Sequence, residues 1–396
     1  MSATSIYAYA WDLAEDGLDE VVPRLRDLGI GRIAMAASYH AGKFLRPHGK
    51  RGKVYFPEDG TVYFRPDPGR YGRLKPLANS MLAECDMLAE LCARGDIEAQ
   101  AWTVLMHNSR LGAEHPEACV HNAFGDRYIY NLCPASPDAR AYAVALAGDL
   151  SDRFDLAAIS LETPGYLPYT HGYHHEFAMV RLNGWVNRLL GLCFCDHCLK
   201  GAAKAGIDAT TLRQQVADDI GAALASPGSI PDDMAEAAWL ADVVSDGRLR
   251  AFLQWRCDTV TSLVGDIREV VRKSVNLAVV PSVVRPTAHC WYEGSDIAAL
   301  AKVADTIEAC LYEPSAARVT ADLRDIGRRM KGEGCVRALL RPGYPDFEDR
   351  DAFLAAVRAA RNEGVDGLGF YNYGHLPAAH LDWIGDATNE SRSMRS

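Results

Sequence analysis

Residues 18–37, LDEVVPRLRDLGIGRIAMAA, contain one complete unit of the fold that the sequence predicts. Apolar residues recur at helical spacing over Leu18–Leu28, and the following Leu28-Gly-Ile-Gly segment is typical of a glycine stop at the end of a helix. The apolar run Arg32–Ala37 then predicts a strand. A similar turn, Gly-Val-Asp-Gly, precedes the predicted strand Asp366–Asn372. The chain therefore repeats β/α units.

Short apolar runs predict eight strands: Ile6–Trp11, Arg32–Ala37, Glu98–Met106, Leu156–Glu162, Asn276–Val284, Thr306–Tyr312, Cys335–Arg341 and Asp366–Asn372. Amphipathic segments predict helices between them, at Leu18–Leu28, Leu77–Arg94, Ala139–Arg153, Ile297–Val303, Thr320–Lys331 and Asp349–Asn362. Eight such units close an α/β fold of the (β/α)8 TIM-barrel type, with a packed interior. We expect one catalytic domain over residues 1–390 and a disordered tail over residues 391–396.

Two connections are longer than those of a plain barrel. Residues 38–76 follow the second predicted strand, and residues 163–245 follow the fourth; the segment Asp246–Lys273 is then predicted to be the barrel helix after that strand. Loops that follow barrel strands lie on the C-terminal face, where barrel enzymes bind their substrates. Long insertions at this face are therefore predicted to be functional.

The composition excludes several classes of protein. A net charge of −10 argues against a nucleic-acid-binding protein. The first residues lack a basic region followed by an apolar run, and no stretch of about eighteen apolar residues suggests a membrane span. We expect a cytoplasmic protein without a membrane partner; the sequence leaves open whether it is a homo-oligomer. The eleven cysteines fit reduced thiols and a metal site better than a disulfide framework.

Three of these cysteines lie within six residues, in Cys193-Phe-Cys195-Asp-His-Cys198. Thiols at this spacing can converge on one tetrahedral ion. Cys133 is the best candidate for a fourth ligand, because its loop precedes the strand that ends in Glu162. Four thiolates fill a tetrahedral zinc ion, so the metal would be structural. The alternative is a group of reduced, buried thiols.

The order Cys133-Pro-Ala-Ser-Pro137, a strand ending in Glu162, and then the three-cysteine segment resembles the zinc-bearing β-galactosidases of glycoside hydrolase family 42. The resemblance covers roughly residues 125–200 and implies a TIM-barrel enzyme. It implies a structural zinc ion on Cys133, Cys193, Cys195 and Cys198, and a general acid/base role for Glu162. The family has Asn-Glu where this chain has Leu161-Glu162, and its second glutamate is not visible here.

The strand ends carry the candidate catalytic and substrate-binding residues. Glycoside cleavage needs two carboxyl groups, and Glu162 and Glu313 are the predicted pair, because both follow apolar strands. Asp346 and Asp12 are alternatives for the second carboxylate; a glutamate at a strand end could also be a salt-bridge partner of a nearby arginine. The predicted sugar-binding residues are Trp11, His40, His107, Asn108, His171, His174, Arg285, Trp291, Tyr312, Arg341, Tyr371, Asn372 and His375.

These residues predict a glycoside hydrolase that cleaves a small glycoside or oligosaccharide by paired carboxylates, without an organic cofactor. The expected partner is thus a small-molecule carbohydrate. A second hypothesis is a sugar lyase or isomerase that uses His107 and the run His171-Gly-Tyr-His-His175, with or without a catalytic metal. A third is a barrel that has lost its activity and binds a sugar as a sensor.

The insertion at residues 38–76 is basic in an acidic chain, with nine lysines and arginines against three acidic residues. Such a segment can draw in an anionic ligand, and Arg285 and Arg341 at strand ends could form bidentate pairs with a uronic acid. The alternative is a solvated face or a subunit contact. Val54–Phe56 and Thr61–Phe64 flank Pro57-Glu-Asp-Gly60 and predict a β-hairpin.

Overall fold

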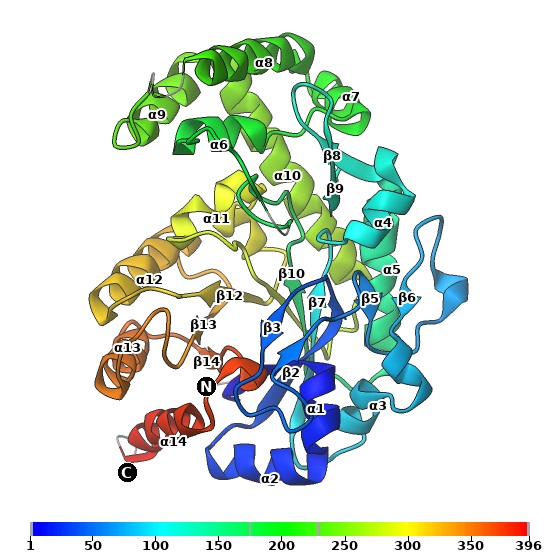
Figure 1. The fold of residues 1–396 in the computed structure, drawn as a ribbon, viewed down its shortest axis with the longest axis vertical. Coiled ribbons are helices and arrows are strands. Elements are labelled where there is room, and N and C mark those ends of the chain that lie inside the picture. Colours follow the sequence, from blue (N-terminus) through cyan, green and yellow to red (C-terminus); the bar gives the residue numbers. More distant parts are fainter. Residues whose placement is uncertain (1–2, 174–175, 227, 229, 394–396) are drawn as a thin grey trace.

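A computed structural model describes residues 3–173, 176–226, 228 and 230–393 and contains a closed barrel of eight parallel strands (Figure 1). Each strand pairs with its successor, and β1 pairs with both β2 and β14, which closes the sheet. The (β/α)8 prediction is confirmed. The barrel strands are β1 (Ser5–Ala8), β2 (Arg32–Tyr39), β7 (Glu98–Val104), β10 (Ala158–Glu162), β11 (Asn276–Val279), β12 (Thr306–Cys310), β13 (Cys335–Leu340) and β14 (Gly367–Phe370).

Several strands end earlier than the sequence predicts. The first was expected to reach Trp11, but helix α1 (Ala10–Asp16) begins two residues after β1 ends. The fifth was expected to reach Val284 and ends at Val279. In both places the chain leaves the sheet and enters loops of the C-terminal face. These loops are buried, so their residues are mostly apolar and look in the sequence like a continuation of the strand.

Helices surround the barrel at the predicted places, and the glycine stops are confirmed by the positive φ of Gly29 and Gly364, 78° and 79°. The segment Leu77–Arg94 is an exception: it forms β6 (Leu77–Ala78), a 3₁₀ turn and only a short α3 (Met87–Cys92). The other barrel helices are α2 (Leu18–Asp27), α5 (Pro137–Arg153), α10 (Gly247–Val270), α11 (Ile297–Leu300), α12 (Ala316–Met330), α13 (Arg350–Asn362) and α14 (Ala378–Ser393).

The chain ends in helix α14, which runs to Ser393 and so includes the first three residues of the predicted tail at residues 391–396; residues 394–396 lie outside the described part. Among the described residues, no helix is both long and apolar enough to cross a bilayer.

The predicted hairpin within residues 38–76 is wrong. Strand β4 (Val54–Tyr55) pairs with β3 (Phe44–Leu45), upstream of it. Strand β5 (Thr61–Val62) instead extends the main sheet, antiparallel to β2 and parallel to β6. The segment Pro57-Glu-Asp-Gly60 contains a turn, but the two runs that flank it pair with other strands and not with each other.

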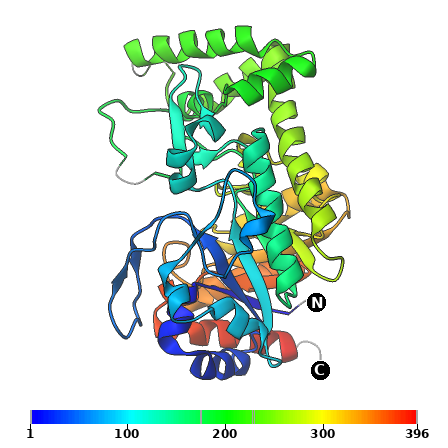
Figure 2. The ribbon, with the colours of Figure 1, turned by 90° about the vertical axis from the view of Figure 1, so that its right-hand side faces the viewer.

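The second insertion forms a layer of helices beyond one end of the barrel (Figures 1 and 2). It contains α6 (Gly184–Leu190), α7 (Asp196–Lys204), α8 (Ala209–Ala225) and α9 (Ala235–Ser245). These helices share a hydrophobic core with the hairpin of β8 (Cys119–His121) and β9 (Arg127–Leu132), separate from the barrel core. Helix α10 runs from this layer back along the barrel beside α5, so the two cores are held by one continuous helix.

The inside of the barrel contains a buried charge that the sequence analysis missed. Glu308 on β12 is fully buried and accepts hydrogen bonds from Tyr7 at 2.5 Å and from Gln100 at 3.0 Å. Arg337 lies 3.4 Å from the same carboxylate, and Ser160 donates to it as well. Because every partner comes from a different strand, this network ties together five strands of the barrel.

Candidate active site

Glu162 lies at the C-terminal end of β10, where the sequence placed it. Its side chain is partly buried, and Oε2 accepts a hydrogen bond from the indole Nε1 of Trp102 on the neighbouring strand β7, at 2.5 Å. Burial raises the pKa of Glu162 to about 7, although the Trp102 hydrogen bond and the positive charge of Arg285 act in the opposite direction. A carboxyl group with this pKa can both donate and accept a proton near neutral pH.

Three hydrogen-bonded tyrosines lie near this carboxyl group. Tyr9 donates to Tyr39 at 3.0 Å, and the hydroxyls of Tyr9 and Tyr371 are also 3.0 Å apart. Burial raises the pKa of Tyr371 to about 12 and that of Tyr39 well above its usual range, and the nearby Glu162 contributes in both cases. The tyrosines therefore stay neutral and offer hydroxyl groups and ring faces beside Glu162, as a sugar site requires.

Arg285 lies in the loop after β11 and Arg341 directly follows β13, and both guanidinium groups are over the ring of Tyr312, at 4.5 and 4.3 Å from its centroid. They differ in their partners. Arg341 forms a bidentate pair with Asp346, at 2.7 and 2.5 Å, so both groups are engaged. Arg285 donates only to backbone carbonyls, and its buried Nε has no partner among the described residues.

Glu313 lies three residues beyond β12 and is 3% exposed. Its Oε2 accepts a hydrogen bond from Arg318 at 2.7 Å, while its buried Oε1 has no partner within the described structure. Arg318 is on α12, so this carboxylate is held from the helix layer. By contrast, Glu308 of β12 contacts Tyr7 of β1, and Tyr312 contacts Tyr371, which follows β14.

Asp12, an alternative second carboxylate, is paired inside the protein. Arg46 of the first insertion donates to it at 2.6 Å and also binds Glu15 at 2.9 Å; all three side chains are less than 10% exposed. Burial raises the pKa of Asp12 to about 6, against the effect of Arg46. Five of the nine basic residues of this insertion form ion pairs with carboxylates: Arg46, Lys50, Arg65, Arg70 and Arg73. Much of its positive charge is thus neutralised within the chain.

The histidines of the C-terminal face form a second group. The rings of His40 and His107 are stacked at 3.9 Å, and His171 lies 5.8 Å from His107. Burial lowers the pKa of His171, and Arg285 adds to this, which favours the neutral imidazole. His174 and His175 lie outside the described residues. Among the described residues, only the four predicted cysteines form a group able to hold a metal ion.

The remaining predicted binding residues have structural partners. Trp11 is stacked between Tyr9 and Tyr55, at 4.3 and 4.7 Å. Asn108 and Asn372 cap the N-termini of α4 (Ser109–Glu114) and of a 3₁₀ turn. Trp291 lines a separate cavity, and His375 contacts the Tyr9 hydroxyl at 3.4 Å.

The cysteine cluster is assembled as the sequence predicts. Cys133, Cys193, Cys195 and Cys198 are buried, and their sulfur atoms lie within 4.8 Å of one another. The sulfur of Cys133 is 3.5, 3.6 and 3.9 Å from those of Cys198, Cys195 and Cys193. These separations exceed a disulfide bond of about 2.05 Å. They match the edge of a tetrahedron with Zn–S bonds of about 2.3 Å, which is about 3.8 Å. The donor set therefore fits a zinc ion.

Two interactions near Glu162 were not predicted from the sequence. Trp102 fixes the carboxylate, and Tyr9 links Tyr39 to Tyr371. Both residues lie in or next to apolar runs that satisfied the strand pattern, so their polar atoms gave no separate signal.

The barrel and the arrangement of its mouth can be compared with known proteins. No family model matches the chain, and neither does any curated protein sequence. Among solved structures, the glycoside hydrolase domain of PgaB (BpsB) from Bordetella bronchiseptica is similar with a TM-score of 0.60 and 13% identity, over 98% of both chains. Alpha-L-fucosidase isoenzyme 2 from Paenibacillus thiaminolyticus is similar with a TM-score of 0.52 and 10% identity, over the whole of this chain and 50% of that one.

The descriptions of both similar structures are those of glycosidases. At these identities the likeness establishes the fold of this chain. Activity has to be argued from the site.

Proposed function

We propose that the protein is a glycoside hydrolase in which Glu162 is the general acid/base. The observation that carries this proposal is the position of Glu162 at the barrel mouth, buried enough for a pKa of about 7 and oriented by Trp102. A carboxylic acid that is still protonated at neutral pH can protonate a leaving glycosidic oxygen. The neutral tyrosines beside it are suited to bind sugar hydroxyls and ring faces.

Glu313 is proposed as the second carboxylate, since one of its oxygens is held by Arg318 and the other has no partner in the described structure. Asp346 is the competing candidate, and its bidentate pairing with Arg341 argues against it. Asp12 binds Arg46 through Oδ1, and its buried Oδ2 has no partner in the described structure, so Asp12 remains an alternative. If Glu313 is the nucleophile, Glu313→Gln abolishes turnover, whereas Asp346→Asn leaves measurable turnover; the reverse result would assign Asp346.

The activity is tested with a panel of aryl glycosides, uronides included. Glu162→Gln keeps the acceptor for Trp102 and removes proton transfer, which typically contributes 10²–10⁴-fold. Turnover of substrates with poor leaving groups should fall by about that factor, and substrates with good leaving groups should lose less in the first step. The matched control is Glu98→Gln. Glu98 begins the neighbouring strand β7, at the end of the barrel away from Glu162, and pairs with Arg32. Normal turnover by Glu162→Gln would reject the assignment.

We also propose that the cysteine cluster holds a structural zinc ion, which would join the insertion core to the loop before α5. Zinc saturated by four thiolates supplies folding stability and has no open position for substrate. Elemental analysis should find about one equivalent per chain, and Cys195→Ser should lose it. Cys119→Ser is the control, because Cys119 is buried nearby but outside the cluster. A zinc-free wild-type protein would overturn this proposal.

A further inference from the structure

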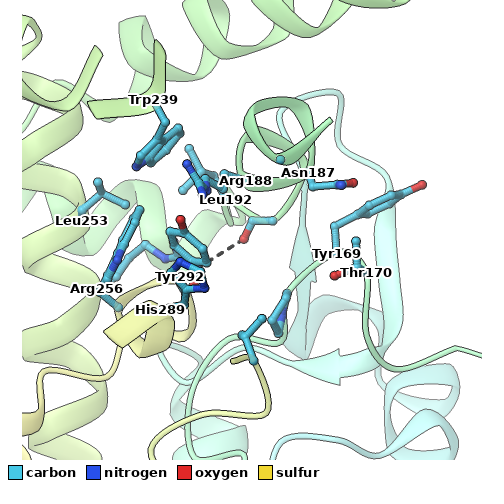
Figure 3. Close-up of a pocket in the computed structure, with 15 residues that line it drawn as sticks. Tyr169, Thr170, Asn187, Arg188, Leu192, Trp239, Leu253, Arg256, His289 and Tyr292 are labelled. Carbon is cyan, nitrogen blue, oxygen red and sulfur yellow. Dashed lines mark hydrogen bonds between the residues drawn. The ribbon is translucent and has the colours of Figure 1, made fainter. Parts of the chain in front are cut away.

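A cavity of about 200 Å³ lies between the second insertion and the loop that follows β11 (Figure 3). One water molecule needs roughly 10–15 Å³, so the space is large enough for an organic ligand. Its walls come from the end of the β10 loop, from α6, from α9 and α10, and from the turn at Thr287–Glu293. Figure 3 shows Trp239 and Tyr292 on one side of this cavity and Tyr169 on the other.

Five buried polar atoms on the walls have no hydrogen-bond partner within the described structure. They are Asn187 Oδ1, Arg188 Nη1, Trp239 Nε1, Arg256 Nε and Tyr292 OH. Three of them can only donate, and a fourth is a hydroxyl group. Each unsatisfied buried group typically costs about 1–3 kcal/mol, and such groups are rare in folded proteins. Their concentration around one space indicates a ligand or solvent rich in acceptors.

The charge of the walls indicates which ligand. Among the described lining residues there are two arginines and one histidine, and no aspartate or glutamate. The Arg188 guanidinium lies over Tyr292 at 4.5 Å and over Trp239 at 5.6 Å, and its one carboxylate partner, Glu236, is 65% exposed. A planar cation held between aromatic faces can form a forked pair with a carboxylate.

Arg256 is the more buried of the two cations, at 1% exposure, and it forms no ion pair in the described part of the chain. It donates to the backbone oxygens of Gly191 and Tyr292. Its guanidinium also lies 4.3 Å from the ring of Tyr166, whose hydroxyl is 3.6 Å from Cys198. The charge of the cysteine cluster can therefore balance Arg256. The charge of the cysteine cluster does not balance Arg188. The binding test below therefore changes Arg188.

The cavity adjoins the barrel mouth. Val284 and His289 both line it, and the Arg285 guanidinium between them in sequence is over Tyr312 at the mouth. His289 Nδ1 is 3.1 Å from the backbone oxygen of Arg285. The loop that presents Arg285 to the mouth thus also forms a wall of the cavity.

We propose that this cavity is a subsite for a carboxylate-bearing sugar unit of the substrate, with Arg188 binding the carboxylate and the rings of Trp239, Trp291 and Tyr292 contacting the sugar face. The inference rests on the proposed glycosidase function and adds its substrate class. Nothing in the chemistry of the walls selects a neutral sugar over a uronate, whereas the Arg188 guanidinium, whose carboxylate partner in the described structure is the exposed Glu236, favours the acid.

Binding is measured in Glu162→Gln protein, so that no turnover interferes, by titrating tryptophan fluorescence with D-glucuronate and D-galacturonate. D-glucose, D-galactose and inorganic phosphate are the comparison ligands. We expect the uronates to bind more tightly than the neutral sugars and than phosphate, and salt to weaken them. Arg188→Met should weaken uronate binding by at least about 10-fold. Arg248→Met, at the start of α10 and outside the cavity, should have no effect.

A second variant distinguishes a loss of binding from a loss of folding. Tyr292→Phe removes a hydroxyl that has no partner within the described structure, so the unliganded protein should not become less stable, while uronate binding should weaken by about 2- to 10-fold. Equal binding of uronate to Arg188→Met and its parent, or tighter binding of glucose or phosphate, overturns the subsite. So does a uronate-soaked crystal with only water on these atoms. If uronate binds as expected but no glycoside is cleaved by the wild type, the subsite stands and the proposed hydrolase function falls.

Discussion

Replacing Glu162 with glutamine should stabilise the protein at alkaline pH. Burial raises the pKa of this carboxyl group from 4.5 to about 7, so the folded state holds a proton that the unfolded state releases between these two values. Stability therefore falls as pH rises from about 4.5 to about 7 and then stays low. A shift of roughly 2.5 pKa units, at 1.36 kcal/mol for each, corresponds to at most about 3 kcal/mol. Glutamine cannot ionise, so the variant does not lose this stability.

The effect is large enough to measure by thermal unfolding. An unfolding entropy of about 2.1 cal/mol/K per residue gives roughly 0.8 kcal/mol/K for 396 residues. We then expect Tm of Glu162→Gln to exceed that of the wild type by up to about 4 °C at pH 8, and to equal it at pH 4. Circular dichroism melts at pH 4, 5.5, 7 and 8 give the curve.

The control is again Glu98→Gln, because the Glu98 side chain is largely exposed and pairs with Arg32. This variant should gain no stability over the wild type between pH 4 and pH 8. A difference between Glu162→Gln and wild type that is the same at every pH, or a variant less stable at pH 8, would refute the burial argument and with it the raised pKa.

Three other changes test the surroundings of the site. Trp102→Phe removes the donor that lowers the pKa of Glu162, so the alkaline limb of kcat/KM should move to higher pH; a limb that stays in place would contradict this role. Arg46→Met leaves Asp12 and Glu15 buried without their partner and should destabilise by about 3–5 kcal/mol in denaturant unfolding. Lys50→Met, at an exposed pair, should cost less than about 1 kcal/mol, and equal losses would show that Arg46 is not a buried anchor. Arg285→Met should raise KM for a uronide far more than for the matching neutral glycoside, because its Nε has no partner among the described residues, whereas Arg341→Met, whose partner is Asp346, should affect both equally; the opposite ranking would exclude Arg285 as a second cation, beside Arg188, that recognises substrate charge.

The barrel could be predicted because each strand is buried on both sides and therefore appears as a short apolar run. For the same reason the ends of two strands could not be predicted: the residues after Ala8 and Val279 remain buried although they leave the sheet. Glu308 was overlooked inside such a run, although a lone carboxylate among apolar neighbours is the signal of a buried network. The hairpin at residues 54–64 failed because pairing depends on which distant edge is free, and local sequence does not contain that information.

The position of Glu162 at the end of a strand, and the convergence of Cys193, Cys195 and Cys198 from their close spacing, could be predicted from the sequence. Contacts within the site could not be predicted where a polar group reaches it from another strand or loop. Trp102 orients Glu162 from a neighbouring strand. The cavity beside Arg285 is built from segments that lie more than a hundred residues apart, and no single one of them contains the pattern.

Closure of the barrel has a bearing on how the chain is made. Strand β14 pairs with both β1 and β13, and Ser5 lies opposite Gly369, roughly 360 residues away. At about 5–20 residues per second, synthesis of that stretch takes on the order of 20–70 s. During this time the edge of β1 that will bind β14 is unpaired, and once β13 has been made its free edge is unpaired as well; such edges can recruit strands from other chains. A ribosome that stalls before Gly367 therefore releases an open sheet with two edges, and such fragments should be found bound to chaperones while the chain that includes β14 is not.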